Sequence, residues 1–327
     1  MDHSTGNFHI GGEEIAASIR FQDLVDALAS MHREAPAILK DMLLEQPGRE
    51  GQDHLLVRAA WQAGEALGVK MASIFPGNRE LGLPAVHAAY ILLDGLSGIP
   101  LLSIDGNALT HLKTAADSAL GSRMLAREDC HTLLMVGAGA MAPHLIEGHC
   151  AVRPCINRVL VWNRSPERRD ELVRGLAGQF DISAADDLAT AVGQADIISC
   201  ATMTVEPLIQ GEWLQPGTHL DLVGAFRPDM READDQVLRK GCLFVDSRLT
   251  TIGEIGEVAI PMATGVLSVD DILADHYELC TGSPGRTDDS QITVFKNGGG
   301  GHLDLMTARY IRKTCRGQEI GSSPPPD

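Results

Sequence analysis

The chain has 327 residues, 44% of them apolar and 22% charged, as is typical of a soluble globular enzyme with one large domain or two ordinary ones. A formal net charge of −17 makes nucleic acid and anionic membranes unfavourable partners. The first residues lack the basic and apolar regions of a signal peptide, and no apolar run approaches the length of a membrane span. The seven cysteines show no CxxC and no cysteine–histidine ligand spacing. We therefore expect a reduced, cytoplasmic protein without a metal site.

The first third of the chain mixes helix and strand patterns. Residues 21–35, "FQDLVDALASMHREA", place apolar side chains at helical spacing. Residues 53–61, 68–77 and 88–106 predict strands separated by glycine and proline turns, and "SGIP" inside the last range predicts a hairpin. This part of the chain is therefore expected to form a small α+β domain.

From Leu112 onward, strand and helix patterns alternate. A helix is predicted over 112–127, and the closing helix over 301–314 is expected to return to the first domain. The predicted strands lie within 132–139, 158–164, 196–202, 218–225 and 242–247, and the predicted helices within 142–152, 165–180 and 186–194. Such alternation predicts an α/β fold with a Rossmann-type, doubly wound parallel sheet.

The pattern also predicts the domain boundaries. Residues 1–114 and 298–320 would form a substrate-binding and dimerisation domain, and residues 115–297 the nucleotide-binding domain. The last residues, 321–327 with the sequence "GSSPPPD", are expected to be disordered.

A glycine-rich turn follows the first strand of the predicted Rossmann domain. Gly137, Gly139 and Ala142 form a GxGxxA pattern, in which small residues allow a tight turn and close approach to a pyrophosphate. The alternative is an ordinary glycine turn, but this one follows a strand and opens a helix. We expect the backbone of Gly137, Ala138, Gly139, Ala140 and Met141 to bind the phosphates of a dinucleotide.

The second predicted strand ends in "VWNRSPERR" rather than in the acid that holds the ribose of NAD. Asn163, Arg164, Ser165 and Arg168 suit a 2′-phosphate, which an acid would repel. The alternative is a solvated basic start of a surface helix, although cations are unfavourable at a helix N-terminus unless an anion is present. We expect NADPH, with NADH as a weaker cofactor. Thr202, Met203, Val223 and Gly224 follow later strands and are expected at the same ligand-binding edge.

Four segments together resemble the ornithine cyclodeaminase/mu-crystallin family. They are "LGVKMASIFPGNRELGLPAVHAAYILLDGLSGIPLLSIDGNALTHLKTAADSALGSRMLAR", "LLMVGAGAMA", "LVGAFRPDMREAD" and "FKNGGGGHLDLMTARY". The resemblance implies an NAD(P)-binding Rossmann domain and a second domain built from both chain ends. It also implies a homodimer in which the first domains of two subunits join their sheets.

Two positions separate the reactions of this family. Cyclodeaminases, which convert ornithine to proline and ammonia, carry an aspartate in a "GGDxPGKxEL"-like segment and a glutamate in an "ELMP"-like strand. Here Phe226 and Leu56 match those places. "GAFRPDMRE" resembles the ketimine-reductase branch instead. That branch reduces cyclic imino acids, Δ1-pyrroline-2-carboxylate to L-proline in proline metabolism or Δ1-piperideine-2-carboxylate to L-pipecolate.

Reduction of an imino acid needs a carboxylate anchor and a proton for the ring nitrogen. The resemblance implies that Lys70 and Lys113 hold the carboxylate, the latter where an arginine is usual, and Arg58 on a neighbouring strand would complete the clamp. Lys70 is also the candidate proton donor to the imine nitrogen. It lies between apolar residues in a predicted strand, where an unpaired cation is costly, and this favours a functional role. Surface cations paired with nearby acids are the alternative. The resemblance also implies that His302 lies near the nicotinamide, with helix capping as the alternative.

Other functions remain open at this point. They are an ornithine cyclodeaminase, an amino-acid dehydrogenase of the same family, and a protein that binds NADPH or a small molecule without catalysis, as mu-crystallin does. Thr114 is expected at a helix start, where it caps the helix or contacts the nicotinamide.

Overall fold

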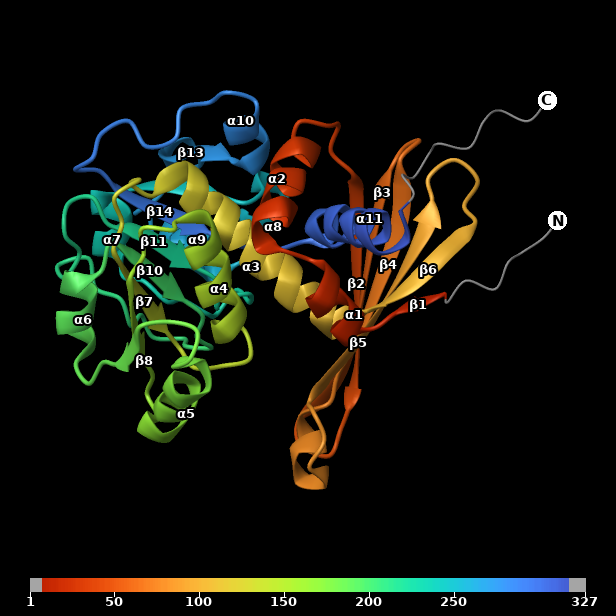
Figure 1. Cartoon of the computed structure of the whole chain (residues 1–327), viewed down its shortest axis with the longest axis horizontal. Coiled ribbons are helices and arrows are strands. Elements are labelled where there is room, and N and C mark those ends of the chain that lie inside the picture. The colour runs from red at the N-terminus through yellow and green to blue at the C-terminus, as the bar shows by residue number, and fades with distance from the viewer. Residues whose placement is uncertain (1–7, 318–327) are drawn as a thin grey trace. The chain divides into compact units, whose positions relative to one another are not determined.

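A computed structural model describes residues 8–317, which divide into two compact units (Figure 1). Of the described residues, 8–113 and 300–317 belong to the first unit, and Thr114–Gly299 form the second. The predicted disordered tail, residues 321–327, lies outside the described residues. All seven cysteines are free thiols.

The first unit is built on a sheet in the order β1-β6-β5-β4-β3-β2. Its strands are β1 (His9–Ile10), β2 (Ile38–Pro47), β3 (Gln52–Gln62), β4 (Ala66–Ile74), β5 (Val86–Asp94) and β6 (Pro100–Asp105). Strands β2 to β6 pair antiparallel with their neighbours, and β1 pairs parallel with β6. The hairpin predicted at "SGIP" is confirmed, because it joins β5 to β6.

Helices cover one face of this sheet. They are α1 (Gly12–Ser18), α2 (Phe21–Met31) and α11 (Gly301–Arg316), with the short 3-10 helix η1 (Pro76–Leu81) after β4. Figure 1 shows α11 against the sheet, where it contacts β2 to β5, and it also packs on α2. Gly299 has a φ of +68°, a left-handed conformation that favours glycine just before α11 begins. Helix α11 belongs to the same compact unit as this sheet.

The second unit contains a parallel sheet in the order β13-β12-β14-β11-β10-β7-β8-β9. Its strands are β7 (Thr132–Val136), β8 (Arg158–Trp162), β9 (Ile182–Ala184), β10 (Ile197–Cys200), β11 (His219–Leu222), β12 (Gly241–Val245), β13 (Ile272–Asp275) and β14 (Ile292–Lys296). Every adjacent pair is parallel, which confirms the predicted doubly wound α/β fold.

Helices connect these strands. They are α4 (Ala142–Val152), α5 (Pro166–Leu176), α6 (Leu188–Gln194), α7 (Asp235–Lys240), α8 (Arg248–Thr251), α9 (Gly256–Ala263) and α10 (His276–Cys280), with the 3-10 helix η2 (Val269–Asp271). Side chains such as Leu134, Ile198, Leu220 and Val294 form the apolar core of the sheet. The strands β10 and β11 are buried along their whole length, which is typical of a sheet covered on both faces.

Helix α3 (Gly106–Leu125) is longer than predicted, because it begins at Gly106 rather than near Leu112. Thr114 therefore lies inside the helix, so the prediction that it stands at the helix start is wrong. Asp105 explains the earlier start, because its Oδ1 accepts hydrogen bonds from the backbone N–H groups of Asn107 at 2.9 Å and Ala108 at 3.0 Å.

Candidate functional site

The loop between β7 and α4 has the geometry that a dinucleotide pyrophosphate requires. Gly137 has a φ of +108°, and a Cβ there would lie 2.6 Å from the backbone oxygen of Ala201. A Cβ on Gly139 would meet nothing within 4 Å, so this part of the loop is open. No side chain caps the N-terminus of α4 at Met141. The loop residues therefore fit a pyrophosphate, since backbone N–H groups at a helix N-terminus bind phosphate.

Asn163 connects this loop to the end of β8. Its Oδ1 accepts a hydrogen bond from the Ala138 N–H at 3.1 Å, and its Nδ2 donates to the Ser165 carbonyl at 2.9 Å. Ser165 caps α5, because its Oγ accepts from the Arg168 N–H at 3.4 Å, and this hydroxyl also donates to Glu167 at 2.7 Å. Asn163 and Ser165 thus shape the loop, in addition to any contact that they make with a ligand.

Arg164 and Arg168 differ from the other arginines around α5. Both are exposed, and the structure gives neither an ion pair with an acid among residues 8–317. Arg169, by contrast, binds Asp170 at 2.8 Å and Asp186 at 2.7 Å, and the Arg174 Nε donates to the Asp170 carbonyl. The two guanidinium groups at the start of α5 are therefore available to an anion.

The predicted residues after β10 and β11 meet through a residue that the sequence did not reveal. Glu232 accepts hydrogen bonds from the N–H and Oγ1 of Thr202 at 2.7 and 2.8 Å, and from the Gly224 N–H at 2.7 Å. The Val223 N–H donates to the Cys200 carbonyl at 2.8 Å. Met203 projects outward, with 71% of its surface exposed. These contacts bring Thr202 and Gly224 together at the carboxyl edge of the sheet.

The strand order places this edge at a topological switch point. Strand β7 lies between β8 and β10, so the chain winds outward in one direction through β8 and in the other through β10. Dinucleotides bind across such a point, with one nucleotide half on each side. The arginines after β8 therefore lie on one half of the site, and Thr202 and Gly224 lie on the other.

In the first unit, two of the predicted cations sit in register on adjacent strands. Arg58 on β3 is the direct partner of Lys70 on β4, so both side chains project from the same face of the sheet. Arg58 Nε lies 2.8 Å from Oδ2 of Asp41, and Lys70 Nζ lies 2.8 Å from Oδ2 of Asp304. Each of these cations is thus already paired with a carboxylate.

Lys113 adds a third cation. It is buried in α3, and its charge acts on Asp304. Burial by itself would raise the pKa of Asp304, but the charges of Lys70 and Lys113 and the hydrogen bond from Lys70 lower this pKa below its ordinary value. Asp304 is therefore ionised at neutral pH and holds Lys70 in place. Arg58, Lys70, Lys113, Asp41 and Asp304 together carry one net positive charge.

Asp304 and Tyr90 belong to this cluster but were not among the residues predicted for it. Neither Asp304 nor His302 caps α11, because the N-cap is Gly300 and no side-chain cap bond is present. His302 is buried, and its ring lies 6.2 Å from the ring of His32 in a T-shaped contact. Tyr90 is the in-register neighbour of Lys70 on β5, and burial followed by the charge of Asp304 raises its pKa. The helical register of "GHLDL" could have placed Asp304 on the buried face.

Apolar side chains occupy the two positions at which the cyclodeaminase pattern has carboxylates. Phe226 is 56% exposed just beyond β11, and the Arg227 guanidinium lies 5.9 Å from its ring centroid. Leu56 on β3 is half-buried between its in-register partners Leu43 and Ala72. Neither place therefore offers a carboxylate.

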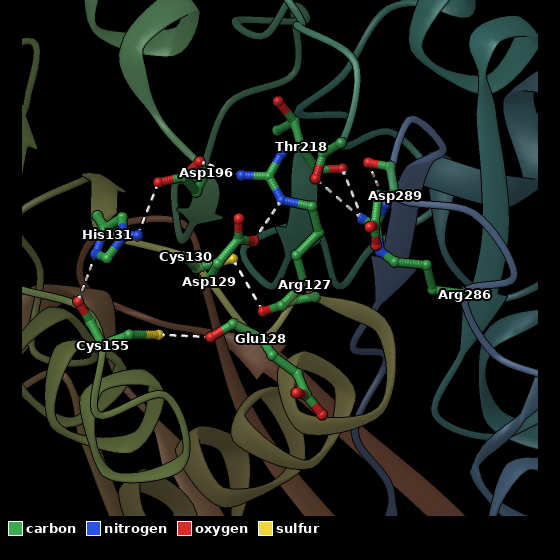
Figure 2. A network of polar contacts seen from close by, with 12 residues as sticks. Arg127, Glu128, Asp129, Cys130, His131, Cys155, Asp196, Thr218, Arg286 and Asp289 are labelled. Atoms are coloured by element: carbon green, nitrogen blue, oxygen red, sulfur yellow. Dashed lines mark hydrogen bonds and ion pairs between the residues drawn. The ribbon is translucent and has the colours of Figure 1, made fainter.

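Two further polar networks in the second unit have structural roles. Ser122 Oγ lies 2.8 Å from His149 Nδ1, and His149 Nε2 lies 3.1 Å from Asp221 Oδ2, but all three residues are fully buried. This arrangement of serine, histidine and acid is closed to substrate, so it serves packing rather than nucleophilic catalysis. The other network, in Figure 2, surrounds Asp196 at the amino ends of β7 and β10, the edge opposite the ligand-binding one.

Two general findings limit the kinds of site. Among residues 8–317, no three histidine, cysteine, aspartate or glutamate side chains are grouped so that they could hold a metal ion. No helix in the same part of the chain is both long and apolar enough to cross a membrane.

Known proteins similar to this chain have related sequences and folds. Residues 12–319 match the ornithine cyclodeaminase/mu-crystallin family. A Δ1-pyrroline-2-carboxylate reductase from Paracoccus denitrificans is 45% identical over 301 residues, which cover 91% of this chain and 94% of that protein. Ketimine reductase mu-crystallin from Mus musculus is 31% identical over 299 residues, covering 90% and 92%.

A solved structure is similar along almost its whole length. Thermococcus litoralis Δ1-pyrroline-2-carboxylate reductase, in complex with NADH and L-proline, superposes with a TM-score of 0.86 at 28% identity. The match covers 94% of this chain and 97% of that one.

Proposed function

The chain belongs to the ornithine cyclodeaminase/mu-crystallin family, and we propose that it is an NADPH-dependent reductase of cyclic imino acids. The proposed reaction converts Δ1-pyrroline-2-carboxylate to L-proline, with Δ1-piperideine-2-carboxylate as a second substrate. The similarity to the reductase of Paracoccus denitrificans supports this reaction class. The cytoplasmic location expected from the cysteine pattern stays a prediction.

One observation favours reduction over deamination. Phe226 and Leu56 occupy the places where the cyclodeaminase pattern has carboxylates. Phe226 is exposed to solvent, and Leu56 lies beside the apolar Ala72. Deamination of ornithine needs acids that move protons to and from the departing nitrogen. Reduction of an imine needs only one proton on the ring nitrogen and a hydride on the adjacent carbon, so it does not depend on these two acids.

The cation cluster of the first unit supports a substrate with a single carboxylate. Its five charged groups carry one net positive charge, which a monoanion neutralises. Lys70 Nζ lies 2.9 Å from Oδ1 and 2.8 Å from Oδ2 of Asp304. An ammonium group has three N–H donors, so Lys70 keeps a donor for the substrate while Asp304 orients it. In this proposal Arg58, Lys70 and Lys113 bind the carboxylate of the substrate. Lys70 also donates the proton to the imine nitrogen.

The second unit is the proposed NADPH site. The loop residues Gly137 to Met141 would hold the pyrophosphate, and Arg164 and Arg168 the 2′-phosphate. When bound, the cofactor supplies the hydride. The exposed, acid-free position of both arginines is what favours NADPH over NADH here. Thr202, Met203, Val223 and Gly224 would contact the other half of the cofactor, with His302 near the nicotinamide.

A panel of substrates tests the proposed reaction. We expect the purified protein to oxidise NADPH with Δ1-pyrroline-2-carboxylate and to form L-proline in equal amount, measured by absorbance and amino-acid analysis. Ornithine with catalytic NAD should release no ammonia. Proline and ammonia formed from ornithine would instead establish a cyclodeaminase, and NADPH oxidation that requires pyruvate and ammonia would establish an amino-acid dehydrogenase. NADPH binding without turnover of any imine would indicate a binding protein.

We also propose that the protein is a homodimer formed through the uncovered face of the first sheet. The face opposite α11 carries large apolar side chains that project into solvent, among them Met42, Leu44, Leu55, Trp61 and Met71. They are in register across β2, β3 and β4, so they form one continuous surface. Exposed apolar patches of this kind mark association sites. A second copy of the same sheet matches such a surface in shape and character.

The variant Met71→Asp tests this dimer. Met71 is 43% exposed and lies between Val57 and Ala89 in register, so a carboxylate there would be buried between two copies. We expect the variant to sediment as a monomer at micromolar concentration, whereas the unmodified protein sediments as a dimer. Leu249→Asp is the control, because Leu249 is 74% exposed in the second unit. A monomeric unmodified protein, or a dimeric Met71→Asp variant, would contradict the proposal.

A further inference from the structure

Glu232 joins two loops of the second unit through one buried carboxylate. Its Oε1 accepts both the N–H and the Oγ1 of Thr202, and its Oε2 accepts the Gly224 N–H, all within 2.8 Å. Thr202 follows β10 and Gly224 follows β11, which are adjacent strands of the sheet. The side chain is fully buried, so these bonds are not shared with bulk water. Each oxygen of the carboxylate thus serves a different loop.

The packing around Gly224 shows how closely the two loops approach. A Cβ on Gly224 would lie 2.0 Å from the Thr202 carbonyl oxygen and 2.6 Å from Oε1 of Glu232. Any residue with a Cβ would clash here, so only glycine fits at position 224 without a movement of the loop. The Glu232 carboxylate lies beside this contact and joins the two loops, in addition to the backbone hydrogen bond from Val223 to Cys200.

The surroundings make this carboxylate costly to maintain. A second buried acid, Glu257, accepts hydrogen bonds from the backbone N–H groups of Glu232 and Ala233 at 2.6 and 3.1 Å. Burial raises the pKa of Glu232, and burial together with the charge of Glu232 raises the pKa of Glu257 to about 7. The buried Lys296 opposes both shifts, and its Nζ donates to the carbonyls of Leu222 and Asn297 at 2.9 Å.

Two adjacent buried acids are an expensive means of joining loops, because an apolar contact or an amide would avoid the desolvation of a charge. Groups with perturbed pKa values concentrate at functional sites. Both loops lie at the carboxyl edge, on the β10 side of the switch point, where the second half of a dinucleotide binds.

We propose that Glu232 is a positioning residue that sets the loops after β10 and β11 for the nicotinamide half of the cofactor. The inference rests on the proposed function in one respect, namely that this edge binds NADPH. It predicts that Glu232 affects binding of the nicotinamide half and leaves binding of the adenosine half unchanged.

Two ligands separate these halves. NADPH contains both, whereas adenosine 2′,5′-bisphosphate contains only the half expected near Arg164 and Arg168. The Glu232→Gln variant keeps one acceptor oxygen and replaces the other with an N–H donor, so it can hold only one of the two loops. We expect the Kd of NADPH, measured by calorimetry on the full chain, to rise about 10-fold or more. The Kd of adenosine 2′,5′-bisphosphate should change less than about 2-fold.

A matched control lies at the opposite edge of the same strands. Asp196 also bridges neighbouring segments, because its carboxylate accepts the His131 N–H at 2.8 Å, the Thr132 N–H at 3.0 Å and the Arg127 guanidinium at 2.7 Å (Figure 2). Asp196→Asn should lower the melting temperature without changing the ratio of the two Kd values. The fluorescence of bound NADPH provides a second readout, since it reports the surroundings of the nicotinamide, and only Glu232→Gln should alter it.

The outcomes are distinct. The inference would be overturned if Glu232→Gln raised the Kd values of both ligands equally, or if it left the Kd of NADPH unchanged. The same holds if Asp196→Asn changes the Kd ratio as Glu232→Gln does. If the unmodified protein binds neither ligand, the proposed NADPH site is wrong and the inference about Glu232 is overturned with it.

Discussion

Replacing Lys70 by methionine is expected to lower kcat/KM for Δ1-pyrroline-2-carboxylate by about 1000-fold or more, because the variant loses a carboxylate anchor and the proposed proton donor together. Charge-assisted hydrogen bonds from buried cations contribute about 1.5–3 kcal/mol each, and loss of proton transfer costs about 100-fold or more in rate. Steady-state NADPH oxidation with the cyclic imine measures the effect. Methionine preserves most of the volume of the lysine side chain, so the packing under α11 is retained.

This substitution has a second consequence, which must be separated from the first. Lys70 and Asp304 are both buried, with 6% and 1% of their side-chain surfaces exposed, and they form an ion pair at 2.8 Å. Removing one partner of such a pair leaves an uncompensated buried charge and costs about 3–5 kcal/mol in the free energy of unfolding. A low activity in Lys70→Met alone would therefore have two explanations.

The double variant Lys70→Met with Asp304→Asn separates them. It contains neither charge, so we expect denaturant unfolding to recover most of the lost stability while kcat/KM stays low. Recovery of activity together with stability would show that Lys70 only balances the charge of Asp304. The amide introduced by Asp304→Asn is not an acid at neutral pH, so it cannot replace Lys70 as the proposed proton donor.

The sequence predicted the strands well where an apolar run was not interrupted by charged residues. The strands β7 and β10 are short, mainly apolar runs, and the alternation with helices indicated a parallel sheet. Strand β2 was missed because charged residues such as Lys40 and Asp41 interrupt it, and because it lies at a sheet edge. Strand β14 was missed although it is central, since its end carries the buried charge of Lys296.

The sequence suggested candidate site residues one at a time, but it did not indicate which of them are paired. Lys70 and Asp304 are 234 positions apart, and no local pattern indicates that a strand lysine meets a helix aspartate. The same holds for Glu232, whose role depends on two loops that end neighbouring strands of the sheet. The glycine turn at Gly137 could be predicted, because its backbone conformation depends on a few consecutive residues.

The second large effect is expected from a substitution of Arg164, the exposed arginine just after β8. Arg164→Asp is expected to raise the KM for NADPH by about 100-fold, because the proposed bidentate hydrogen bond to the 2′-phosphate would be lost and a carboxylate would repel that phosphate. The KM for NADH should change by less than about 3-fold or fall, since an acid at this place can bind the ribose 2′-hydroxyl. Initial rates with each cofactor at saturating imine measure the two values.

The neighbouring arginine on α5 provides the matched control for this experiment. Arg174 lies in the last turn of the same helix and is exposed, so Arg174→Asp makes the same change of charge away from the start of α5. If the effect of Arg164→Asp came from the general field of a protein with a net charge of −17, both variants would weaken NADPH alike, and high salt would remove the difference. A direct contact predicts a loss in Arg164→Asp alone, because a bidentate bond depends on position. Equal responses of NADPH and NADH in Arg164→Asp would mean that Arg164 does not read the 2′-phosphate, and the cofactor preference would then have to come from elsewhere in the loop.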